Sequence, residues 1–161
     1  MEESLIICVT KIIKRVMKMR WNTSEKLRAL LFELVSWESE TLTIGEQNFS
    51  RKLYAMLQEL TYFQHHPSYL TVSEVDHGRQ VVSALYKKDE TRDTIVLISH
   101  FDTVQIEEYG AFKHLATKPE ELTKAFLENP TLLNESAKKD IQTGDYLFGR
   151  GVMDMKMGLA L

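Results

Sequence analysis

Apolar positions recur at helical spacing in two stretches of the first sixty residues. Leucines and a valine repeat every three or four positions up to about Ser36, which predicts a helix after a capping-box sequence, Asn22 to Glu25. The same spacing from about Glu46 to Leu60 predicts a second amphipathic helix, and the polar stretch between the two is expected to be a loop. The first half of the chain therefore begins with a pair of helices.

The pattern then changes to the alternation that is typical of strands. Tyr69 to Val75 and Gln80 to Tyr86 predict two strands joined by a hairpin turn at Asp76 to Arg79. The next apolar stretch, Thr94 to Val104, reads TIVLISHFDTV and leaves Ile95 to Ser99 no solvated face. This continuous run predicts a strand buried on both sides, as in a parallel sheet covered by helices.

The remaining third of the chain is more polar. A proline followed by two acids predicts a short helix over Pro119 to Glu128, which Asn129 and Pro130 end. Lys138 to Gly144 is expected to be a polar connection, and Met155 to Leu161 looks like the opening of a helix. Together these elements predict an α/β fold.

Residues 1–20 form a separate amphipathic stretch, with apolar positions at helical spacing and basic residues on much of the other face. Its acidic start and short apolar run argue against a signal peptide. A membrane-surface helix is one interpretation. An extra helix packed on the domain, or a dispensable extension, is favoured over it.

Composition narrows the function classes. The length of 161 residues and the 43% hydrophobic content predict one domain with a core, and a net charge of −3 gives no reason to expect a nucleic-acid partner. The single Cys8 cannot form an internal disulfide, and no apolar run reaches the roughly 18–20 residues that span a bilayer. We therefore expect a cytoplasmic protein without a membrane partner.

The first candidate for chemistry lies at the end of the predicted central strand. His100 and Asp102 share one face if the extended geometry persists, and ligand sites in open α/β sheets lie beyond the carboxyl ends of the strands. A ligating histidine usually donates its other ring N–H to an acceptor, which Asp102 could supply or help to orient. Taken alone, the pair is weak evidence, because Asp102 could equally cap a turn.

The second candidate is the sequence GRGVMDMKMG, residues 149–158. Gly149 and Gly151 permit a sharply bent backbone, and Asp154 stands where a helix opens. The carboxylate could bridge two cations or could simply be a helix N-cap. A nucleotide-binding loop is disfavoured because position 154 holds Asp where the third glycine of that motif would stand.

The two motifs together resemble the M20-type family of metal-dependent peptidases and amidohydrolases. That family is marked by an H-x-D-T/V-V stretch and then a G-R-G-x-x-D-x-K-x-G stretch. The sequences around the two motifs, DTVQIEEYG and GDYLFGRGVMDMKMG, are most similar to the RocB-type arginine-utilisation branch. The resemblance covers residues 19–161 and leaves 1–18 as an extension.

The resemblance implies the amino-terminal part of a zinc-exopeptidase-like three-layer fold, with a mixed, largely parallel sheet covered by helices. It implies His100 as a metal ligand, Asp102 as the catalytic-motif acid that orients it, and Asp154 as the carboxylate bridging two divalent metal ions, usually zinc. The implied reaction is hydrolysis of an amide bond in a peptide-like or N-acyl amino acid substrate, in arginine degradation.

Several family features lie outside these 161 residues, among them a Glu-Glu pair, a further acidic ligand and a distal histidine. One metal would receive only His100 and Asp154, and the other only Asp154. We therefore expect a truncated catalytic domain, inactive alone and completed by a carboxyl-terminal portion or by a homo-oligomer. The alternative hypothesis is a non-catalytic remnant or interaction module that keeps the front half of the fold.

Overall fold

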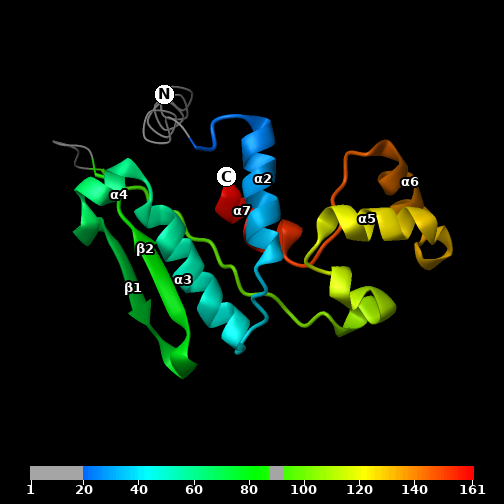
Figure 1. Cartoon of the computed structure of the whole chain (residues 1–161), viewed down its shortest axis with the longest axis horizontal. Helices are drawn as coiled ribbons and strands as arrows, with labels where there is room; N and C mark the ends of the chain where they lie inside the picture. The colour runs from blue at the N-terminus through cyan, green and yellow to red at the C-terminus, as the bar shows by residue number, and fades with distance from the viewer. Residues whose placement is uncertain (1–19, 88–92) are drawn as a thin grey trace.

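Three helices and a β-hairpin make up most of residues 20–87 (Figure 1). The computed structural model describes residues 20–87 and 93–161, so the amphipathic extension predicted over residues 1–18 lies outside them. Helix α2 spans Ser24–Ser36 and α3 spans Ile44–Gln58. A short helix α4 (Thr61–His65) then leads into strands β1 (Leu70–Glu74) and β2 (Gln80–Ala84).

Helix α2 forms where the apolar spacing predicts it, with Leu30, Leu31, Leu34 and Val35 buried. Its cap is one residue later than expected. Thr23 has the extended backbone that an N-cap requires, and its side chain accepts from the Lys26 amide at 3.3 Å. Asn22 instead accepts from the Lys26 ammonium.

The hairpin confirms the strand prediction. β1 and β2 pair antiparallel with Leu70 opposite Ala84 and Glu74 opposite Gln80. The turn between them contains His77 and Gly78 at φ 58° and 72°. Gly78 reaches this left-handed region without strain, because it has no Cβ. The turn delivers Arg79 to the start of β2.

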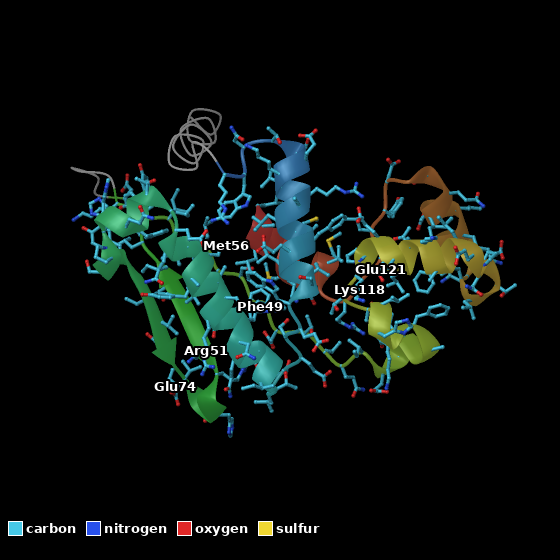
Figure 2. All side chains as sticks on the ribbon, in the orientation of Figure 1. Phe49, Arg51, Met56, Glu74, Lys118 and Glu121 are labelled. Atoms are coloured by element: carbon cyan, nitrogen blue, oxygen red, sulfur yellow. The ribbon has the colours of Figure 1, made fainter. Side chains whose placement is uncertain are left out.

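The hydrophobic core lies between α2, α3 and the carboxyl-terminal segment. Figure 2 shows Phe49 and Met56 between α3 and α2. Helix α7 (Met157–Ala160) and the irregular turn η5 (Val152–Lys156) close this core from the opposite end of the sequence. The buried members are Leu30, Leu31, Leu34, Val35, Phe49, Leu53, Met56, Val152 and Ala160.

The prediction of a central strand is wrong: the structure forms no strand over residues 93–102. Residues 93–102 run without a strand partner in the described part of the chain, and the one bridge joins Glu40 to Thr103 in parallel. The side chains of Ile95 and Ile98 are 59% and 86% exposed. A continuous apolar run is buried on both faces only when neighbouring strands and covering helices are present. The described residues supply neither, and they form one two-stranded sheet rather than a three-layer, largely parallel one.

The segment after the first motif is mostly helical. Two 3-10 turns joined at Gly110 make up η3 (Glu107–Leu115), and α5 (Pro119–Glu128) forms as predicted. The expected polar connection at 138–144 is instead the helix α6 (Glu135–Thr143). Asn134 caps it by accepting from the Ala137 amide at 2.8 Å, and Ile141 is buried. These two signals were missed because the window is otherwise polar.

None of the helices that the structure describes combines the length and the apolar character needed to cross a bilayer.

Candidate functional site

Backbone hydrogen bonds from a neighbouring loop fix the end of the first motif. The Ser39 hydroxyl donates to the Phe101 carbonyl at 2.6 Å, and the Thr103 amide donates to the Ser39 carbonyl at 2.9 Å. The Thr41 amide in turn donates to the Thr103 carbonyl at 3.0 Å. The Phe101 ring also stacks on the buried Phe49 ring, with 4.5 Å between centroids. These contacts hold Phe101 to Thr103 against the core and so position the side chains on either side of Phe101.

The second motif reaches the first through a glycine turn. Gly151 has φ 74°, and a Cβ built on it would lie 2.7 Å from Cγ2 of Thr103. Any larger residue would therefore push the two motifs apart. The turn continues to Asp154, whose peptide bond to Met155 is cis.

The two motifs meet at His100. Its Nε2 lies 2.9 Å from Oδ1 of Asp154, although the two residues are 54 positions apart in the sequence. Its Nδ1 faces Asp102, at 3.2 Å from the backbone carbonyl and 3.4 Å from Oδ1. The structure thus brings together all three residues that the sequence singles out.

The helix-capping alternative for Asp154 finds no support in the geometry. Helix α7 begins at Met157, and no side chain caps it. The Asp154 carboxylate lies three residues before that helix, is 86% exposed and contacts the His100 ring.

Two residues outside both sequence motifs, Thr41 and Arg79, hold the Asp102 carboxylate. Its Oδ2 accepts from the Thr41 hydroxyl at 3.0 Å and lies 3.2 Å from Nη2 of Arg79. Arg79 in turn donates from Nε to Glu46 at 2.6 Å, and this hydrogen bond raises the pKa of Arg79. Glu46 is buried and accepts from the Leu42 amide at 2.7 Å. An acid in the first turn of a helix and an arginine after a hairpin turn are common, so no local pattern marks them.

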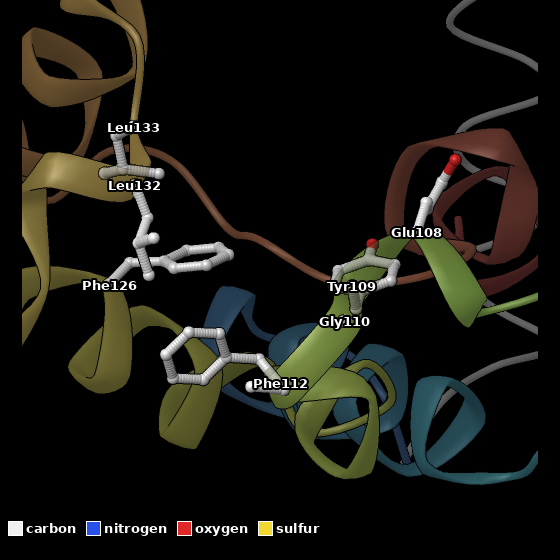
Figure 3. A pocket seen from close by; sticks show the side chains of 8 residues that line it. Glu108, Tyr109, Gly110, Phe112, Phe126, Leu132 and Leu133 are labelled. Carbon is white, nitrogen blue, oxygen red and sulfur yellow. The ribbon is translucent and has the colours of Figure 1, made fainter.

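A cavity of about 320 Å³ surrounds the His100–Asp154 pair. Its lining includes Thr41, Asp102, Arg150 and Met153. A larger cavity of about 490 Å³ lies between η3 and the α5 region, where Phe112 and Phe126 face each other (Figure 3). Glu108 on the rim of the larger cavity contacts Arg150, whose guanidinium also lies over the Tyr109 ring. The larger cavity is lined by aromatic and aliphatic side chains and Glu108, with no histidine among them.

Lys156, the lysine of the second motif, is buried in the core. Its Nζ donates to the Trp37 carbonyl at 2.7 Å and lies 4.9 Å from the centroid of the Phe49 ring. Burial lowers the pKa of Lys156 to about 8. The lysine thereby joins the second motif to the start of the loop that holds the first.

The donor pair is of a type that zinc binds, although its present separation is that of a hydrogen bond. Zinc binds imidazole nitrogen and carboxylate oxygen at about 2.0–2.2 Å, so two donors at tetrahedral angles lie roughly 3.4 Å apart. The pair at 2.9 Å needs only a small adjustment to reach that value. Within residues 20–87 and 93–161, no group of three or more His, Cys, Asp or Glu side chains is arranged to hold a metal. The described residues therefore supply two donors, fewer than the three protein ligands of a catalytic zinc site.

Two curated proteins of Bacillus subtilis (strain 168) are similar to this chain. It is 48% identical to the uncharacterized protein YqjN over 143 residues, which are 89% of this chain and 26% of YqjN. It is 31% identical to the protein RocB over 144 residues, which are 87% of this chain and 25% of RocB. No family model and no solved structure matches it. The chain thus spans about a quarter of the length of the curated relatives that it matches.

Proposed function

We propose that this chain contributes one side of the two-metal centre of a metal-dependent amide hydrolase. The observation that carries the proposal is the 2.9 Å approach of His100 Nε2 to Asp154 Oδ1. These are the two positions that the resemblance to the M20-type family assigns as ligands. A histidine and a carboxylate brought together by two separate motifs form a donor set that zinc accepts.

Each residue has a distinct task in this proposal. His100 would hold one ion through its ring, while Asp102 faces Nδ1 and would fix the orientation of the ring. The exposed carboxylate of Asp154 would be the group on this chain that is shared between the ions. When bound, such ions activate a water molecule near neutral pH and polarise the carbonyl of the substrate.

The proposed substrate is a peptide-like or N-acyl amino acid compound, and the proposed setting is arginine degradation in the cytoplasm. Support comes from the resemblance to the RocB-type branch and from the 31% identity to RocB. The ligands missing from the described residues would come from a polypeptide equivalent to the remaining three quarters of the relatives or from a second copy. If they come from such a polypeptide, the 161-residue chain alone should bind metal without turning over amides; if they come from a second copy, turnover should appear only where the chain self-associates.

A second candidate function, a non-catalytic interaction module, is favoured by one observation. Val96, Leu97 and Ile98 are between 73% and 86% exposed, which is unusual for three consecutive apolar residues. The two functions differ in whether the His100–Asp154 pair binds metal.

Zinc binding by the 161-residue chain tests the proposal directly. Calorimetric titration with Zn²⁺ should show binding, and both His100→Ala and Asp154→Ala should weaken it by more than about tenfold. His77→Ala is the matched control, because His77 lies 3.0 Å from Asp76 in an exposed hairpin turn. A wild-type chain that binds no zinc, or variants that bind it as tightly as His77→Ala, would contradict the metal role.

Turnover is tested in a longer polypeptide that can supply further ligands. A chimera in which this chain replaces the matching quarter of YqjN should hydrolyse N-acyl amino acids or dipeptides in the presence of Zn²⁺, Mn²⁺ or Co²⁺. Asp154→Ala in the chimera should abolish the reaction. Native YqjN serves as the reference for each substrate and metal. A folded chimera that neither binds metal at this pair nor turns over any of these substrates would favour the interaction module.

A further inference from the structure

We infer that Arg79 is a positioning residue for the metal site, acting through Asp102. This inference rests on the proposed function and adds to it a residue that neither sequence motif contains. Arg79 lies at the end of the hairpin turn, before β2 (Gln80–Ala84), 21 positions before His100. Its guanidinium joins a buried acid of α3 to the acid that faces the histidine.

The two oxygens of Asp102 have different partners. Oδ2 faces the scaffold, where it accepts from the Thr41 hydroxyl at 3.0 Å and lies 3.2 Å from Nη2 of Arg79. Oδ1 faces Nδ1 of His100 at 3.4 Å. Fixing Oδ2 at two points therefore fixes the direction of Oδ1, and with it the acceptor that the imidazole meets.

Arg79 is itself held in place from the other side. Its Nε lies 2.6 Å from Oε1 of Glu46, whose side chain is only 5% exposed. The second oxygen of Glu46 accepts from the Leu42 amide at 2.7 Å, so the acid cannot rotate freely. Glu46, at the amino terminus of α3, therefore restrains Arg79, and Arg79 restrains Asp102.

The guanidinium suits this task better than an ammonium group would. Its donors lie in a fixed plane, so Nε and Nη2 can engage two different carboxylates at once. A lysine at position 79 would keep the charge but offer a single donor centre on a flexible stem. If Arg79 is removed, only the Thr41 hydroxyl still ties Oδ2, and the carboxylate can turn about that one bond.

The conformation of Asp102 in the metal-free chain gives the first test. Three-bond NMR couplings should report one χ1 rotamer for Asp102 in the wild type and an average over rotamers in Arg79→Ala. Arg51→Ala is the matched control, since it removes the same charge from an exposed position on helix α3. It should leave the Asp102 couplings unchanged. A single, unchanged rotamer in Arg79→Ala would overturn the inference.

Zinc affinity gives the second test and separates positioning from general stability. Arg79→Ala should weaken Zn²⁺ binding about tenfold, the lower end of the range for residues that support ligands. Arg79→Lys should fall between this variant and the wild type, and Arg51→Ala should change the affinity by less than about twofold. Thermal unfolding of each metal-free variant shows whether it is folded at the temperature of the titration.

A double-mutant cycle with Asp102→Ala completes the test. If Arg79 acts through Asp102, replacing Arg79 in the Asp102→Ala background should cost less than about twofold in zinc affinity. An equal tenfold loss in both backgrounds would show a merely structural effect and overturn the inference. A wild-type chain that binds no zinc would instead contradict the proposed function, while the Asp102 couplings would still decide the role of Arg79.

Discussion

The two halves of the predicted central strand differ sharply in how they are held. Phe101 to Thr103 are tied to the loop at Ser39 and Thr41 by five hydrogen bonds and to the core by the stacked Phe101 ring. Ile95 to Ile98, a few residues earlier, are 59–86% exposed and have no strand partner in the described part of the chain.

In this structure the His100–Asp154 site forms without the predicted parallel sheet. His100 lies between the two halves, and the contacts of its ring are to Asp102 in the anchored half and to Asp154. A short loop and one aromatic stack suffice to bring it to Asp154, without the parallel sheet in which the sequence placed it. Substitutions that remove contacts of the anchored half should therefore destabilise the site, and substitutions in the exposed half should not.

The largest expected effect comes from removing the ring on which the anchored half is stacked. Phe49 is 0% exposed and contacts both Phe101 and Trp37. Phe49→Ala should lower the free energy of unfolding by about 3–5 kcal/mol, because it leaves a cavity in the packed core. Urea titration followed by circular dichroism measures the loss. A decrease below about 1 kcal/mol would mean that the stack does not hold the anchored half.

The second effect is a dependence of stability on pH that comes from Lys156. Its ammonium donates a hydrogen bond to the Trp37 carbonyl, just before the loop at Ser39 and Thr41. Burial lowers the pKa of Lys156 from 10.5 to about 8. Between pH 8 and 10.5 the unfolded chain therefore binds more protons than the folded one, so the stability contribution of this group rises as pH increases through that window. The full change is on the order of 3 kcal/mol.

Urea titrations of the metal-free chain across that window measure the slope. Lys156→Met is the comparison variant, because it keeps the length of the buried stem and removes the titration. Subtracting the two curves cancels the tyrosines and other groups that titrate at high pH. Equal slopes for the two proteins would show that Lys156 is solvated in solution.

The elements predicted correctly are those whose signal is local. The stripe of α2, the hairpin turn at Asp76 to Arg79 and the helix Pro119–Glu128 are all encoded within their own residues. The central strand is different, because burial on both faces is a property of its neighbours. Its apolar run would need neighbouring strands and covering helices to be buried, and the described residues do not place any there.

The candidate site divides in the same way. His100, Asp102 and Asp154 were found because they stand in two recognisable motifs, and the structure brings them together. Arg79 and Glu46 were missed, since each looks ordinary in its own window and they meet Asp102 only through tertiary folding. Whether the three motif residues bind metal stays a prediction.

The third effect tests the hydrogen bonds of the anchored half. Ser39 is 2% exposed, and its hydroxyl donates to the Phe101 carbonyl at 2.6 Å. Ser39→Ala should cost about 1–3 kcal/mol, because it leaves a carbonyl without its donor in a buried setting. Ser36→Ala is the matched control, since its hydroxyl donates to the Glu33 carbonyl at 2.7 Å on the exposed end of α2. Similar losses in the two variants would remove the distinction between a buried and an exposed donor.

The smallest effect is expected in the exposed half. Leu97 is 83% exposed, so Leu97→Gln should change the free energy of unfolding by less than about 0.5 kcal/mol. The same substitution at Leu34, which is 1% exposed, should cost several times more, because it buries an amide in the core.

The polar side chain should also reduce self-association, since an exposed apolar segment can pair with another chain. Light scattering at increasing concentration measures that change.

One result would contradict the contrast between the anchored and the exposed half. If Leu97→Gln destabilised the chain by more than about 2 kcal/mol, the exposed half would have to be covered in solution, and such a loss is expected only for buried positions. A concentration-dependent loss would assign the cover to a second copy, because dissociation of a dimer depends on protein concentration and unfolding of a monomer does not.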